Sequence, residues 1–135
     1  MKATRASVDE YAYEMHRKDQ LLDLFTELEE SEKAEKKALP LRDRKYDRIV
    51  NDHGVIKKVN ESSIVWMRDK GDKFEIPLTK KICDLLLVDD TLVMAIGKRQ
   101  KQWRIMHLVG IASSVGGQTM ASFAVPRAEN PKYLN

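Results

Sequence analysis

The chain has 135 residues, of which 42% are hydrophobic and 33% are charged, and its formal net charge is +3. This length allows one compact domain with an appendage and is too short for two domains of ordinary size. The small net charge does not by itself indicate a polyanionic partner. Residues 53–112, however, carry 11 basic and 7 acidic side chains, so the central part of the chain is basic.

The chain has a single cysteine, Cys83, and therefore no internal disulfide. This is compatible with a reducing compartment. No apolar run approaches the roughly 20 residues that a membrane-spanning helix needs. The N-terminal residues lack the apolar core of a signal peptide. We therefore expect a cytoplasmic protein with no membrane partner.

Residues 1–40 are predicted to form a long helix. Ser7 and Glu10 have the spacing of a capping box, and Pro40 ends the helical pattern. Steps of three, four and seven residues place one set of apolar side chains on a single stripe. This set consists of Val8, Tyr11, Met15, Leu22 and Phe25. The stripe could cover a barrel end, pair with a second copy of the chain or bind a partner protein. After Leu28 the helix is charged on all sides, and we expect it to be solvated.

Residues 41–52 read as a polar linker, with room for one further helical turn. Residues 53–112 then change to the two-residue alternation of β-strands. Five strands are predicted, at "GVIKKV", "SIVWMR", "KFEIPL", "TLVMAI" and "KQWRIMHLVGI". A short helix, "TKKICDLLL", separates the third strand from the fourth, with Thr79 as its cap. Gly71 is expected to have positive φ in a hairpin turn.

The alternation predicts one barrel core, which Trp66 is expected to join. Its other members are Phe74, Ile76, Leu78, Leu92, Met94, Ile96 and Ile105. The predicted fold is mainly β with a long N-terminal helix. Its body is a small five-stranded, OB-like barrel with a helix between strands three and four. Residues 113–135 are rich in small and polar side chains and predict a flexible tail, with a possible edge strand at 119–126.

The order of three strands, a helix and two strands is that of an OB-fold. "HGVIKKV", "LLLVDDTLVMAI" and "KQWRIMHL" resemble the first strand, the entry to the fourth strand and the closing strand of S1-type OB domains. The spacing of these segments also resembles that in bacterial translation initiation factor one, a minimal domain of this type. The resemblance covers residues 53–112 only. Asp89 stands where that family usually has glycine, and aspartate tolerates the left-handed conformation better than most residues.

The resemblance implies a single-stranded nucleic acid as partner, RNA ahead of DNA, because OB-fold loops bind oligonucleotides. The turn "GKRQKQWR" would then hold phosphates while its tryptophan stacks on a base. The predicted contact residues are Lys57, Lys58, Arg68, Lys98, Arg99, Lys101, Trp103 and Arg104. A second interpretation of the turn is a solvated hairpin tip with a core tryptophan, and the strand lysines could instead protect a sheet edge.

The sequence gives little support for a metal site or a catalytic site. His16, His53 and His107 lack the spacing of metal ligands, and Cys83 has no cysteine partner. No pair of carboxylates lies in an apolar setting. We therefore expect neither a cofactor nor an enzymatic activity. The alternative function is that of a protein adaptor, in which the barrel is a scaffold and the N-terminal helix and the tail recognise a partner or a second copy.

Overall fold

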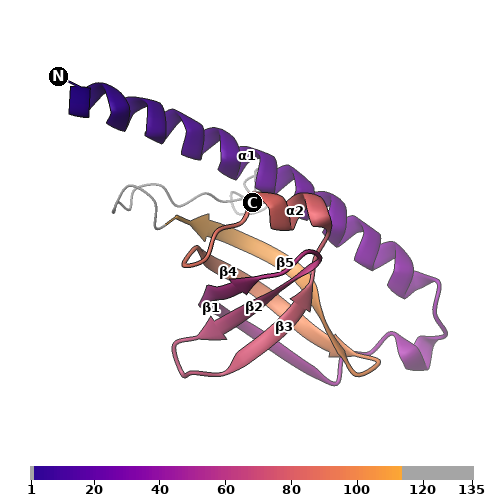
Figure 1. Cartoon of the computed structure of the whole chain (residues 1–135). Helices are drawn as coiled ribbons and strands as arrows, with labels where there is room; N and C mark the ends of the chain where they lie inside the picture. Colours follow the sequence, from indigo (N-terminus) through magenta and orange to yellow (C-terminus); the bar gives the residue numbers. More distant parts are fainter. Residues whose placement is uncertain (1, 114–135) are drawn as a thin grey trace, which may run out of the picture.

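The computed structural model describes the backbone of residues 2–113 and the side chains of residues 12–113. A long helix is followed by five strands, with a short helix between the third and the fourth (Figure 1). In chain order the elements are α1 (Lys2–Lys37), a 3-10 turn η1 (Leu41–Asp43), β1 (Arg48–Val59), β2 (Ser63–Arg68), β3 (Lys73–Pro77), α2 (Lys80–Leu85), β4 (Thr91–Arg99) and β5 (Gln102–Ala112). The predicted fold class is confirmed. The predicted tail and its edge strand at 119–126 lie outside the described residues.

The five strands form one antiparallel sheet in the order β3-β2-β1-β4-β5. Strand β1 belongs to both halves of the sheet, because Gly54 is opposite Arg68 on β2 and also opposite Leu92 on β4. A Cβ atom at Gly54 would lie 2.8 Å from the Trp66 ring and 2.7 Å from the Met67 carbonyl oxygen. Only glycine therefore fits at this position.

The sheet curls around one hydrophobic core, and all seven predicted core residues are buried in it. Trp66 is fully buried as well, and its indole N–H donates to the Leu92 carbonyl oxygen at 3.2 Å. The two-residue alternation thus predicted correctly which side chains of β3 and β4 face inward. It could not predict that the curled sheet stays open, with β3 and β5 as its two edges. Side chains connect these edges: the Phe74 and Trp103 rings meet edge to face at 4.9 Å.

Helix α1 packs against β5 and α2, and its N-terminal part extends beyond the sheet (Figure 1). Leu21, Leu22 and Phe25 enter the core. The prediction that the charged half of α1 has nothing to contact was wrong. The Glu29 carboxylate accepts the backbone N–H of Leu108 on β5 at 2.9 Å, and Glu32 is 8% exposed. The helix therefore covers the β5 edge, where main-chain donors would otherwise lack strand partners.

Two predicted boundaries were displaced, while three local features were confirmed. The capping box at Ser7 and Glu10 does not mark the start of the helix, because α1 begins at Lys2 and nothing in the preceding Ala-containing stretch breaks a helix. Strand β1 begins at Arg48, so residues 48–52 belong to the sheet rather than to a linker. Gly71 has φ +97, and Asp89 has φ +77. The Thr79 hydroxyl accepts from the Ile82 N–H, as expected of an N-cap.

A buried ionic cluster joins α1 to the loop before β4. The Arg17 guanidinium, 2% exposed, donates to Asp90 at 3.0 Å and to the Leu85 carbonyl oxygen at 2.6 Å. It also pairs with Glu14 at 2.8 Å. Burial by itself would raise the pKa of Glu14, but the hydrogen bonds and charge of Arg17 outweigh burial and lower it. No local sequence pattern indicates this cluster, because Arg17 and Asp90 are 73 residues apart.

Candidate nucleic-acid interface

The β4–β5 hairpin, which contains most of the predicted site, turns through two residues of unusual conformation. Gln100 has φ +55 and Lys101 has φ +65, between Arg99 and Gln102, which are paired. Positive φ at both central positions defines the type I′ turn that matches the twist of a hairpin. Neither residue is glycine or asparagine, so this turn stores backbone strain. The turn places the exposed Lys101 side chain at the tip of the hairpin.

The two arginines of the hairpin point to helix α1 rather than to solvent. Arg99 is 1% exposed, and its Nη2 donates to Glu32 Oε2 at 2.7 Å. Arg104 Nη1 is 3.2 Å from Glu35 Oε1 and 3.7 Å from Glu32 Oε1. The predicted phosphate role of Arg99 is therefore corrected, because its guanidinium is buried and already neutralised. Arg104 is also engaged by carboxylates.

Tyr46 completes the arrangement around Glu32. Its hydroxyl donates to Glu32 Oε2 at 3.1 Å, and its ring lies so close to Gly97 that a Cβ atom there would collide with it. Burial and the neighbouring Glu32 charge raise the pKa of Tyr46, although Arg99 acts in the opposite direction. These contacts attach the β4–β5 hairpin to the C-terminal half of α1. We call the set Glu32, Tyr46, Arg99 and Arg104 the hairpin anchor.

The lysines and the tryptophan of the hairpin lie elsewhere. Arg48 on β1, Lys98 on β4 and Trp103 on β5 are directly opposite one another across three neighbouring strands. Directly opposed residues share one face of a sheet. The Arg48 guanidinium lies 5.6 Å from the centre of the Trp103 ring, within cation–π range. Arg48 was not among the predicted contact residues, since only the strand register places it beside Lys98.

Trp103 lies at the border of the core and also beside a cleft. One part of its indole packs against Phe74, at the border of the core, and the side chain is half-buried. Trp103 also borders an open cleft of about 470 Å³ between β3 and β5. The other residues that line this cleft are Ser62, Ser63, Glu75, Pro77, Lys101 and Gln102. We call Arg48, Lys98, Lys101, Trp103 and this cleft the Trp103 surface.

The remaining predicted contact residues lie away from this surface or are already paired. Arg68 forms ion pairs with Asp72 and, at 3.6 Å, with Asp52. Lys57 and Lys58 are exposed near the opposite end of β1. Their neighbour Ile56 is hydrogen-bonded to the loop before β4, whereas Lys98 is at the far end of β4. The eight predicted residues therefore do not form one patch.

The predicted partner stripe on α1 is also divided. Leu22 is 8% exposed and Phe25 is 1% exposed, so both are used within the fold. Met15 is 38% exposed. The side chains of Val8 and Tyr11 lie outside the described ones. Within the described side chains, the stripe is thus buried at Leu22 and Phe25 and exposed at Met15.

Between residues 12 and 113, no three histidine, cysteine, aspartate or glutamate side chains are grouped as a metal site would require. The helices within the described part of the chain lack an apolar stretch of the length that crosses a bilayer. Comparisons with family models, with curated proteins and with solved structures found no match to this chain.

Proposed function

We propose that this protein is a non-catalytic module that binds single-stranded nucleic acid, RNA ahead of DNA, on the Trp103 surface. The observation that carries the proposal is the row of Arg48, Lys98 and Trp103 across three strands, next to an open cleft. A half-buried aromatic ring between cations is the combination that single-strand binding uses, with stacking for the bases and positive charge for the backbone.

We assign the basic residues of the Trp103 surface to the phosphates and its cleft to a base. Arg48, Lys98 and Lys101 would contact phosphates, and Lys98 and Lys101 form no ion pair with other described residues. The cleft would hold a base against Trp103. Glu75 lies in the cleft and accepts a hydrogen bond from the Ser63 hydroxyl at 3.1 Å. Because a carboxylate repels phosphate, we place the nucleic-acid backbone on the lysine side.

One further observation supports the proposed binding, and another bears on where the protein is located. The order of three strands, a short helix and two strands is the order that suggested an S1-type OB domain, a class that binds oligonucleotides. The single cysteine, Cys83, is buried and fits a protein of the reducing cytoplasm. The preference for RNA rests on the S1-type resemblance.

A titration with fluorescent single-stranded RNA and DNA at several salt concentrations tests the proposal. The double variant Lys98→Ala/Lys101→Ala should bind more weakly. Each lost phosphate contact should flatten the salt dependence by about 0.7 in the log–log slope. The matched control is Lys57→Ala/Lys58→Ala, which removes the same charge at the other end of β1. This control should retain the wild-type slope.

Two results would contradict the proposal. One is a wild-type protein that binds no single strand at low salt. The other is an equal loss of slope in both double variants, which would mean that binding follows the overall charge rather than the Trp103 surface. Thermal unfolding of each variant checks that the fold is intact.

A protein adaptor is the second candidate, and one observation favours it. Helix α1 has 36 residues, or about 54 Å at 1.5 Å per residue. Its N-terminal part extends past the sheet (Figure 1). Tyr13, in this half of the helix, is 63% exposed. Sedimentation of the full chain over a range of concentrations would detect self-association through this part. A monomer at all concentrations would count against a homodimer.

A further inference from the structure

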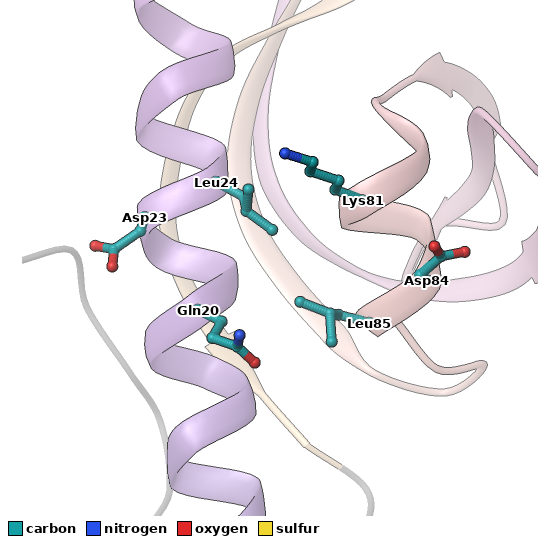
Figure 2. Close-up of a pocket in the computed structure, with 6 residues that line it drawn as sticks. All are labelled: Gln20, Asp23, Leu24, Lys81, Asp84 and Leu85. Carbon is teal, nitrogen blue, oxygen red and sulfur yellow. The ribbon is translucent and has the colours of Figure 1, made fainter.

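Helices α1 and α2 leave an open groove between them, on a side of the molecule that the proposed function does not use. Its volume is about 430 Å³. The side chains of Leu24 and Leu85 lie in the gap between the two helices (Figure 2). Polar groups surround this apolar floor, namely Gln20 and Asp23 on α1 and Lys81 and Asp84 on α2. The groove therefore suits an apolar side chain with polar surroundings.

The described chain ends beside this groove. Arg17 Nη2 donates to the Ser113 hydroxyl at 3.3 Å, while Nη1 of the same guanidinium donates to the Leu85 carbonyl oxygen at 2.6 Å. A single guanidinium thus lies between Ser113 and Leu85, which lines the groove. Ser113, the last described residue, is thus close to one end of the groove.

The sequence beyond Ser113 contains a segment that matches the groove. Residues 119–126 read "TMASFAVP", in which small residues separate Met120, Phe123 and Val125, and Arg127 follows. Phe123 lies ten residues after Ser113, a length that can span about 33 Å when extended. The distance along α1 from Gln20 to Leu24 is only about 6 Å. The linker can therefore reach any part of the groove.

We propose that residues 119–126 bind in the groove between α1 and α2, with the Phe123 ring on Leu24 and Leu85. Because the segment is joined to the groove by a short linker, its effective concentration is in the millimolar range. An interaction too weak to be seen between separate molecules is sufficient here. This inference does not depend on nucleic-acid binding.

Disulfide trapping in the full chain tests the inference. One double variant combines Lys81→Cys on the groove rim with Ala124→Cys, next to Phe123. A disulfide needs Cα atoms within about 7 Å of each other, so its rate of formation reports proximity. The native Cys83 interferes little, because burial raises the pKa of its thiol and keeps it unreactive. The rate is read from gel mobility without reducing agent.

The matched control pairs Ala124→Cys with Lys57→Cys. Lys57 is exposed. The backbone N–H of its neighbour Ile56 donates to the Asp90 carbonyl oxygen, and the Asp90 carboxylate accepts from Arg17. Lys57 is thus next to a residue that this hydrogen-bond network connects to Ser113, but it does not line the groove. We expect the Lys81→Cys pair to close at least about tenfold faster than the Lys57→Cys pair. Its rate should not change with protein concentration. Adding Phe123→Asp should remove the difference, whereas Ser122→Asp should preserve it.

Three results would overturn the inference. Equal rates for the two cysteine pairs would mean that the segment samples the surface without preference. Disulfides between chains, formed faster at higher concentration, would identify a second copy as the occupant. Failure of the Lys81→Cys pair to close, while the Lys57→Cys pair closes, would exclude the segment from the groove.

Discussion

The two kinds of basic residue in the β4–β5 hairpin behave in opposite ways. Arg99 and Arg104 are held by carboxylates of α1, and Arg99 is 1% exposed. Lys98 and Lys101, one or two residues away, face the Trp103 surface. A run that looks uniformly basic therefore contains an internal anchor and an external contact surface.

The chemistry of the two side chains explains this division. A guanidinium is weakly hydrated and presents five donors in a planar fork, so it can satisfy several carboxylate oxygens inside a protein. An ammonium group is compact and strongly hydrated, so its burial is costly. In a hairpin that has a helix on one side and solvent on the other, arginines suit the helix side and lysines the solvent side.

The largest expected effect comes from breaking the hairpin anchor. Arg99→Ala should lower the free energy of unfolding by about 3–5 kcal/mol, because Glu32 would keep a buried charge without its main partner. Denaturant unfolding at neutral pH measures this effect. The double variant Arg99→Met/Glu32→Leu should recover most of the loss, since both buried charges are removed. A loss below about 0.5 kcal/mol, as for an ordinary surface change, would show that Arg99 is not part of the anchor.

Trp103 provides the next largest effect, in binding rather than in stability. Trp103→Leu keeps an apolar contact for Phe74 but removes the ring that would stack on a base. Affinity for single strands should fall by about 1–3 kcal/mol, and the salt slope should remain as in the wild type, because no phosphate contact is lost. Fluorescence titration measures both quantities. Unchanged affinity in a folded variant would assign Trp103 to the core alone.

A smaller contrast separates Arg104 from Lys101. Arg104 is paired with Glu35, which is largely exposed, so Arg104→Ala should destabilise the protein by about 1 kcal/mol or less. Lys101→Ala should change stability by no more than about 0.5 kcal/mol, yet it should reduce the salt slope of binding. If Arg104→Ala changed the slope and Lys101→Ala did not, the assignment of the two sides of the hairpin would be reversed.

The smallest effect is a pH dependence of the hairpin anchor. Burial and Glu32 raise the pKa of Tyr46 above its ordinary value of 10.0, so the folded protein keeps this proton at a pH where the unfolded chain loses it. The stability that Tyr46 contributes should be complete below pH 10.0 and should be lost as the pH rises through the folded-state pKa. Unfolding curves of wild type and Tyr46→Phe across this range measure the effect. Parallel pH profiles for the two proteins would contradict it.

The sequence predicted only part of the Trp103 surface. Lys98, Lys101 and Trp103 were found from their clustering around one turn. Arg48 was missed, because its position opposite Lys98 follows from the pairing of β1 with β4. Lys57 and Lys58 were included because they were expected to lie near the first loop, on a strand that pairs with the strand of Arg68. The actual strand, Arg48–Val59, is long enough to place them near its other end.

The sequence by itself determined the features that depend on local geometry. The two-residue alternation decided which side chains of β3 and β4 enter the core, and Thr79, Gly71 and Asp89 marked a helix start and two tight turns. Only the tertiary structure determined which charged residues are buried in ion pairs and which face solvent. Alternation assigns Arg99 to the face opposite the core, but whether that face meets water or a helix depends on where α1 lies. Glu32 and Arg99 are 67 residues apart, and no local pattern can report that they meet.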